Sequence, residues 1–404
     1  MDFRKNGGKY LVTIEVIILI IVLVLGVLHF IIPDGSKNKT SADGKNNAIS
    51  GTEYIWSATE TGSDTEAGQT TVDAAGNTAV IQVDENVAQA EFSEAVEQKI
   101  AEMSVEQKVC QLFITRPEEV TGVTQFTQAG KKTQESLAAY PLGGYVFGTG
   151  NFNGVTATRN IMANINKYVN TQKTIPMFLA VNEAGGDNSP LAAGNAYEVQ
   201  PAMSGIKTAE EAKTSSGKIS EYMNESMLNM NLAIPVSTSG ECAAAFVDTY
   251  DAAGIYTAAG IFPGENVSDI KSAETNYKAI TQTGVSALIV GNYSCKNLTG
   301  DETMPCSVST KTVGYIRNSL GYIRNSLGYN GIIMTADLSA GVSGNYKADK
   351  AAVSAVKAGV DMIYVSTGFA DCYNAVLTAV QSGDISQDIL DQAVGRIITC
   401  KMGE

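Results

Sequence analysis

The chain of 404 residues has almost no histidine, and its one histidine, His29, lies in a long hydrophobic run near the N-terminus. The rest of the sequence therefore has no imidazole for a Ser-His-Asp or Cys-His nucleophile, and none to ligate a metal ion. Six cysteines are scattered without a CxxC pair, which disfavours a zinc or redox motif of that kind. The sequence predicts no metal and no other cofactor.

Positive charge is also scarce. Lys and Arg number 28 against 42 Asp and Glu, which gives a formal net charge of -14 and an isoelectric point near 4.7. Nucleic acids and anionic membrane surfaces are bound through basic patches, because their phosphates must be neutralised. The composition therefore predicts no nucleic-acid partner and no anionic membrane surface as partner.

A hydrophobic run covers residues 10–32 and is long enough to cross a bilayer as a helix. Residues 1–9 carry Arg4, Lys5 and Lys9, and flanking positive charges favour a cytoplasmic N-terminus with the rest of the chain outside. The run ends without a small-residue cleavage site or a lipidation cysteine. We interpret it as an uncleaved single-pass anchor; a cleaved signal peptide is the alternative.

The segment 33–91 is rich in Gly, Ser, Thr, Asn, Asp and Ala and has few large apolar residues. It cannot bury enough surface to offset the entropy lost on ordering, so we expect a flexible linker. One globular domain is expected over residues 92–404. Within it, Ser104 with Gln107 and Thr208 with Glu211 have the spacing of capping boxes that begin helices.

Short apolar runs that end in small polar residues recur along this domain. They cover residues 144–148, 177–183, 231–236, 287–292, 331–339 and 361–366. Such runs are typical of strands buried on both faces, and helical periodicity separates them. The pattern predicts a single (β/α)8 TIM-like barrel, with an irregular or missing helix near residues 237–260. In such barrels the chemistry lies where the strands end.

A direct repeat interrupts the pattern. The sequence GYIRNSL stands at residues 314–320 and again at residues 321–327. Seven residues make nearly two helical turns, so the repeat predicts a longer helix whose apolar face still points at the barrel.

Two cysteine pairs are candidates for disulfide bridges if the domain faces an oxidising exterior. Cys295 and Cys306 flank one predicted loop, and Cys110 and Cys400 lie near the two ends of the barrel sequence. The alternative is six free thiols.

The order of motifs resembles the N-terminal barrel domain of family 3 glycoside hydrolases, in particular the bacterial β-N-acetylhexosaminidases. The segments that carry the likeness are residues 103–113, 143–147, 175–186, 262–264, 305–309, 331–339, 358–362 and 396–398. Each segment alone is a short match. Their number and order together make a chance likeness improbable.

The resemblance implies hydrolysis of β-linked N-acetylglucosamine with retention of configuration, which requires a carboxylate nucleophile and an acid/base group. The position of the family's nucleophilic aspartate is occupied here by Ala336. The motif that precedes the family's His-Asp acid/base loop stands here at residues 260–266 without histidine, and the family's substrate-binding aspartate is Asn182. The framework motifs are therefore present, whereas the charged site residues are mostly replaced.

The remaining candidates lie at the expected strand ends. Asp337 is a candidate nucleophile, but it should face away from position 336 because neighbouring strand residues point to opposite sides. The interpretation we favour is that Asp337 caps or orients the adjoining helix or loop. Glu183 is the other candidate carboxylate, either for sugar contact or for the amides of the Gly185–Gly186 turn. Candidates for hydrogen bonds to sugar hydroxyls are Asn182, Glu183, Asn292 and Asn151, although asparagine is also common in turns.

Two functions compete on these grounds. One is a catalytically impaired protein on the cell surface that binds a glycan, such as a cell-wall saccharide, or a protein partner. The other is an active β-N-acetylhexosaminidase that uses relocated carboxylates. Because the loss of a covalent nucleophile typically costs several orders of magnitude in rate, the residues favour the first function.

Overall fold

The computed structural model describes residues 69–72, 78–81, 90–236, 239–264, 270–320, 329–340, 342 and 346–403. The segment predicted to be a membrane anchor, residues 10–32, lies outside these residues. None of the described helices is long and apolar enough to cross a membrane. Inside the predicted linker, the strands β1 (Gln69–Val72) and β2 (Thr78–Ile81) pair antiparallel.

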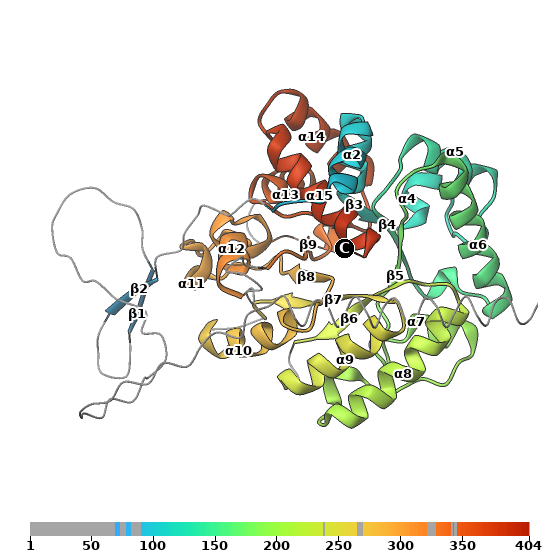
Figure 1. The fold of residues 1–404 in the computed structure, drawn as a ribbon, viewed down its shortest axis with the longest axis horizontal. Coiled ribbons are helices and arrows are strands. Elements are labelled where there is room, and N and C mark those ends of the chain that lie inside the picture. Colours follow the sequence, from blue (N-terminus) through green and yellow to red (C-terminus); the bar gives the residue numbers. More distant parts are fainter. Residues whose placement is uncertain are drawn as a thin grey trace, which may run out of the picture. The chain divides into compact units, whose positions relative to one another are not determined.

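Eight parallel strands form the central sheet (Figure 1). They are β3 (Phe113–Thr115), β4 (Gly144–Phe147), β5 (Phe178–Val181), β6 (Met230–Pro235), β7 (Tyr256–Phe262), β8 (Ala287–Val290), β9 (Ile332–Thr335) and β10 (Ile363–Val365). Each strand from β3 to β8 pairs with the next along the chain, and β10 pairs with β3. A parallel bridge between Met334 and Met362 brings β9 beside β10, so the sheet curls into a nearly closed barrel, as predicted.

Helices surround the strands (Figure 1). They are α2 (Glu94–Glu102), α3 (Val105–Gln111), α4 (Pro117–Thr121), α5 (Lys131–Ala139), α6 (Val155–Gln172), α7 (Pro190–Asn195), α8 (Ala209–Glu225), α9 (Gly240–Ala252), α10 (Ile270–Thr281), α11 (Lys296–Thr299), α12 (Thr310–Tyr315), α13 (Ala348–Lys357), α14 (Phe369–Gln381) and α15 (Gln387–Met402). Both predicted capping boxes are confirmed, at the starts of α3 and α8.

Short helical turns complete the connections. They are the 3-10 turns η1 (Thr149–Asn151), η2 (Met203–Gly205), η3 (Cys306–Val308) and η5 (Leu338–Ala340), and the π-helical turn η4 (Ile316–Leu320).

The helix α9 corrects one expectation, because the segment 237–260 holds a regular helix and not an irregular or missing one. The Ser239 hydroxyl caps its start by accepting a hydrogen bond from the Cys242 N–H at 3.3 Å. Phe246 and Tyr250 are buried on its inner side. At about 1.5 Å of rise per residue, a short segment suffices to return the chain along the barrel.

The repeated heptad does not extend an α-helix over its first copy. Helix α12 ends at Tyr315, and the chain continues as the π-helical turn η4. The second copy lies outside the described residues. Within the first copy, Arg317 is buried and pairs with the buried Asp361, which also binds Arg396 at 3.0 Å.

The carboxyl-terminal mouth of the barrel as candidate site

Parallel strands bring their carboxyl-terminal ends to one end of the barrel, which we call the barrel mouth. Four predicted positions lie at these ends. They are Asn182 after β5, Ile261 near the end of β7, Asn292 after β8 and Ala336 after β9. Asn182 is exposed, Ile261 is 41% exposed and Ala336 is half-buried. The two exposed residues of this set, Asn182 and Ile261, are therefore uncharged.

The ends of β8 and β9 are tied to each other. The Ala336 N–H donates to the Val290 carbonyl at 2.8 Å, and the Asn292 amide nitrogen donates to the Asp337 carbonyl at 2.8 Å. The Asn292 side chain is mostly buried, and its amide oxygen has no hydrogen-bond partner among the described residues. Asn292 thus positions the strand end that carries Ala336.

The Asp337 carboxylate is engaged within the protein. Its Oδ1 accepts hydrogen bonds from the Ser339 N–H at 3.0 Å, the Ser366 N–H at 2.9 Å and the Ser339 hydroxyl. The Ser339 and Ser366 hydroxyls also lie 2.9 Å apart. Asp337 therefore caps the turn η5 and joins it to the loop after β10, as expected of a capping residue.

The Glu183 carboxylate is fully buried beside the start of helix α7. Its Oε2 accepts from the Leu191 N–H at 2.8 Å, and its Oε1 accepts from the Ala192 N–H at 3.2 Å and the Tyr222 hydroxyl at 2.9 Å. Burial raises its pKa, although these hydrogen bonds act in the opposite direction. Glu183 therefore satisfies amides of α7 and not those of the Gly185–Gly186 turn, and its carboxylate is closed off from the mouth.

Asn151 is likewise buried and used by the fold. Its amide oxygen accepts from the Gly148 N–H at 2.8 Å, and its amide nitrogen donates to Glu118 Oε1 at 2.7 Å and the Phe126 carbonyl at 3.1 Å. Of the four predicted hydrogen-bonding residues, only Asn182 is exposed to a ligand in this structure.

Three charged residues that were not among the predicted site residues follow strand β3. The Arg116 guanidinium is half-exposed and lies 3.8 Å from the Glu118 carboxylate. Glu119 Oε2 accepts from the Gly368 N–H at 2.7 Å and the Phe369 N–H at 3.3 Å, which caps α14. In the sequence, these residues could have been found because charged side chains directly follow the short, mostly apolar run 112–115.

Tyr364 on β10 was also missed, and it lies between opposite charges. Burial first, and then the Asp337 carboxylate, raise the pKa of Tyr364 to about 12, whereas Arg116 acts in the opposite direction. Arg116 thus places one cation at the mouth, beside the Glu118 carboxylate, whose Oε1 accepts from the Phe126 N–H and the Asn151 amide and whose Oε2 has no hydrogen-bond partner among the described residues.

The two predicted disulfide bridges are absent, because all six cysteines are free thiols. Cys110 in α3 faces Tyr373 of α14 and is hydrogen-bonded to it, whereas Cys400 lies beside Ser286. The different neighbours explain why the two ends of the barrel sequence are not bridged.

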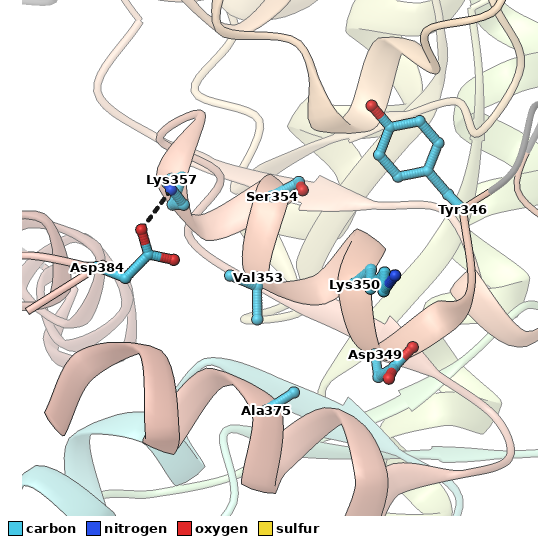
Figure 2. A pocket seen from close by; sticks show the side chains of 8 residues that line it. All are labelled: Tyr346, Asp349, Lys350, Val353, Ser354, Lys357, Ala375 and Asp384. Carbon is cyan, nitrogen blue, oxygen red and sulfur yellow. Dashed lines mark hydrogen bonds and ion pairs between the residues drawn. The ribbon is translucent and has the colours of Figure 1, made fainter. Parts of the chain in front are cut away.

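A groove of about 470 Å³ lies away from the strand ends, between α13 and α14 (Figure 2). Its lining residues are Tyr346, Asp349, Lys350, Val353, Ser354, Lys357, Ala375 and Asp384. An ion pair of 2.6 Å between Lys357 and Asp384 closes one end, as Figure 2 shows. The groove belongs to the helical layer and shares none of the mouth residues.

The fold defined by these strands and helices is a (β/α)8-type barrel. Residues 243–400 match the family described as "Glycosyl hydrolase family 3 N terminal domain". The chain thus has a barrel similar to the N-terminal domain of glycoside hydrolase family 3, and the resemblance predicted from its motifs is confirmed. A comparison with curated proteins finds no match.

Solved structures share the fold. A family 3 β-N-acetylglucosaminidase from Paenibacillus sp. is 21% identical, with a TM-score of 0.65 over 74% of this chain and 62% of that one. A family 3 glycosyl hydrolase from Mycobacterium smegmatis is 20% identical, with a TM-score of 0.61 over 74% of this chain and 98% of that one. A β-N-acetylhexosaminidase from Beutenbergia cavernae is 20% identical, with a TM-score of 0.62 over 75% and 99% of the two chains. The chain spans less than two thirds of the Paenibacillus structure.

Proposed function

We propose that this family 3 glycoside hydrolase-like barrel binds a glycan at its mouth and has lost ordinary hydrolytic turnover. One observation carries the proposal. The position expected for the nucleophile holds the methyl group of Ala336, while the neighbouring Asp337 carboxylate is turned into hydrogen bonds with Ser339 and Ser366. A retaining glycosidase needs two free carboxylates, and without the nucleophile the rate falls by several orders of magnitude.

The mouth still offers groups that suit a neutral saccharide. The exposed Asn182 amide can exchange hydrogen bonds with hydroxyl or acetamido groups, and Ile261 offers an apolar surface to a sugar ring. Arg116 adds a cationic hydrogen-bond donor. We therefore propose an oligosaccharide with β-linked N-acetylglucosamine as the ligand class, which includes cell-wall saccharides.

The alternative is an active β-N-acetylhexosaminidase with relocated carboxylates. It is supported by the activities of two of the structurally similar proteins and by the carboxylates after β3 and β9. It requires Glu118, Glu119 or Asp337 to leave its present hydrogen bonds. Release of the aryl group from an aryl β-N-acetylglucosaminide separates the two functions.

Calorimetry with N-acetylglucosamine oligomers tests the binding proposal. We expect measurable binding by the full-length chain, and a loss of affinity of about tenfold in Asn182→Ala, because a well-placed hydrogen bond to a ligand contributes about 1.4 kcal/mol. The matched control is Asn170→Ala, an exposed asparagine of helix α6. Absence of binding at millimolar ligand, or equal loss in both variants, contradicts the proposal and favours a protein-binding role.

We also propose that residues 10–32 anchor the protein in the cell membrane with the barrel outside. The proposal rests on the length of the apolar run and on the flanking positive charges. Protease added to intact cells should degrade the barrel, while the protein sediments with membranes. Release of the protein into the medium supports the cleaved signal peptide, and protection from the protease contradicts the orientation.

A further inference from the structure

The loop after β8 brings two cysteines together. Ser294 and Pro305 form an isolated antiparallel bridge, and the Cys306 N–H donates to the Tyr293 carbonyl at 2.9 Å. Cys295 and Cys306 stand next to this bridge, and their thiol groups are hydrogen-bonded to each other. Cys306 is fully buried, whereas Cys295 keeps 9% exposure. The geometry is that of a reduced thiol pair, not of a disulfide.

The two thiols have different protonation. The hydrogen bond from Cys306 lowers the pKa of Cys295 to about 6, against the effect of burial and with help from the Leu298 and Asn297 amides. The hydrogen bond to Cys295, together with burial, raises the pKa of Cys306. The two shifts go in opposite directions and favour the thiolate on Cys295, which is also the more accessible of the two sulfurs.

We propose that Cys295 and Cys306 form a reversible thiol redox site, in which Cys295 reacts with a peroxide and Cys306 resolves the product. The Cys295 thiolate attacks one peroxide oxygen, which forms an S–O bond, breaks the O–O bond and releases hydroxide. The Cys306 thiol then attacks the Cys295 sulfur, loses its proton and displaces the oxygen as water. Two thiols and one hydrogen peroxide thus give one disulfide and two waters, and a dithiol reductant reverses the change.

The inference is independent of what the barrel mouth binds. It differs from the structural bridge considered from the sequence, because it assigns unequal roles to the two sulfurs and makes the reduced pair the starting state. Low-pKa thiols next to a second cysteine are the usual arrangement of peroxide-sensitive sites.

Mapping the oxidised cysteines tests the proposal. The full-length chain is reduced, freed of reductant, treated with a small excess of hydrogen peroxide, denatured, alkylated and digested for mass spectrometry. We expect a peptide linked through Cys295 and Cys306, which dithiothreitol resolves into two, while the other four thiols stay available for alkylation. Oxidation of Cys295 no faster than that of the other thiols, or its linkage to a different cysteine, overturns the proposal.

Single substitutions test the two roles. With Cys306→Ser, we expect a sulfenic acid on Cys295 that dimedone traps, formed at least about tenfold faster than any product at Cys372. With Cys295→Ser, Cys306 should stay reduced. Cys372→Ser is the matched control, because burial raises the pKa of that thiol to about 12. Equal oxidation of Cys306 in the Cys295→Ser variant contradicts the assignment, and thermal unfolding checks that each variant is folded.

Discussion

Two buried tyrosines of the barrel differ in what their hydroxyl groups bind. The Tyr145 hydroxyl has no partner among the described residues, whereas the Tyr222 hydroxyl donates to the Glu183 carboxylate at 2.9 Å. We expect Tyr145→Phe to leave the free energy of unfolding unchanged or to raise it by up to about 1 kcal/mol, since it removes an unsatisfied polar group. Tyr222→Phe should lower it by about 2 kcal/mol, because it breaks a hydrogen bond to a buried carboxylate. Urea unfolding measures both, and equal effects contradict this description.

Lys401, in the last turn of α15, is a second buried group with a testable consequence. Its Nζ donates to Gln111 Oε1 at 2.9 Å and lies 4.8 Å from the centre of the Phe178 ring. Burial lowers the pKa of Lys401 to about 7. Above that pH the unfolded chain holds a proton that the folded protein has lost, so the free energy of unfolding rises with pH up to the unfolded pKa.

We therefore expect the free energy of unfolding to rise between pH 7 and 9, with a Lys401 contribution of up to about 1.4 kcal/mol per pH unit. Lys401→Met should remove that part of the slope, although it also leaves Gln111 Oε1 without this donor. Urea unfolding at three pH values gives the slope. Lys167→Met, at an exposed lysine of α6, should keep the slope of the unmodified chain, and a slope that survives in Lys401→Met contradicts the assignment.

For single residues, the sequence predicted correctly that the candidate side chains lie near strand ends. It did not predict which of them are already hydrogen-bonded within the protein. Glu183 follows an apolar run, as a mouth residue should, yet its partner Tyr222 lies 39 residues away in α8. Asn151 is bound to Glu118, 33 residues earlier. Partners this distant are set by helix packing, which has no local sequence signal, so exposure could not be read from the motifs.

The buried ion pair between Arg317 and Asp361 stabilises the chain around β9. Its contribution can be tested with a control in the same sequence, the second copy of the heptad. Arg317 binds Asp361 and also donates to the Tyr329 and Gly331 carbonyls at 3.0 and 2.6 Å. We expect Arg317→Ala to lower the free energy of unfolding by about 3 to 5 kcal/mol, because it leaves part of a buried carboxylate unpaired. Arg324 occupies the same place in the second copy of the heptad.

Arg324→Ala removes the same side chain from the same seven-residue sequence, and we expect a smaller loss in the free energy of unfolding, because the Asp361 carboxylate is already paired with Arg317 and Arg396. Chemical denaturation of both variants shows which copy of the heptad supplies the arginine that pairs with Asp361. A larger loss in Arg324→Ala would show that the second copy supplies the partner of Asp361.

Among the elements, the sequence predicted six of the eight barrel strands, and composition explains the two that were missed. A strand buried on both faces reads as a run of large apolar residues, as in β8 and β9. Strand β3 has three residues, and β7 has the sequence YTAAGIF, whose small central residues do not form such a run. In β7, a Cβ at Gly260 would lie 2.7 Å from the Cβ of Ile289, so close packing of the two strands explains the small residue.

For the whole molecule, the exposed mouth groups predict how binding depends on pH. Asn182 and Ile261 do not titrate, so the affinity for a neutral oligosaccharide should change less than about twofold between pH 5.5 and 8. Calorimetry at four pH values measures this. A steep change between pH 5 and 7 would reveal a carboxylate that acts in binding.

The most direct test of the account is release of the aryl group from an activated aryl β-N-acetylglucosaminide, whose good leaving group needs little acid catalysis. We predict no release above background by the full-length chain, and release together with a glycosyl adduct on residue 336 by Ala336→Asp, which restores a carboxylate at the nucleophile position. Robust turnover by the unmodified chain that Asp337→Asn or Glu183→Gln abolishes would contradict the account.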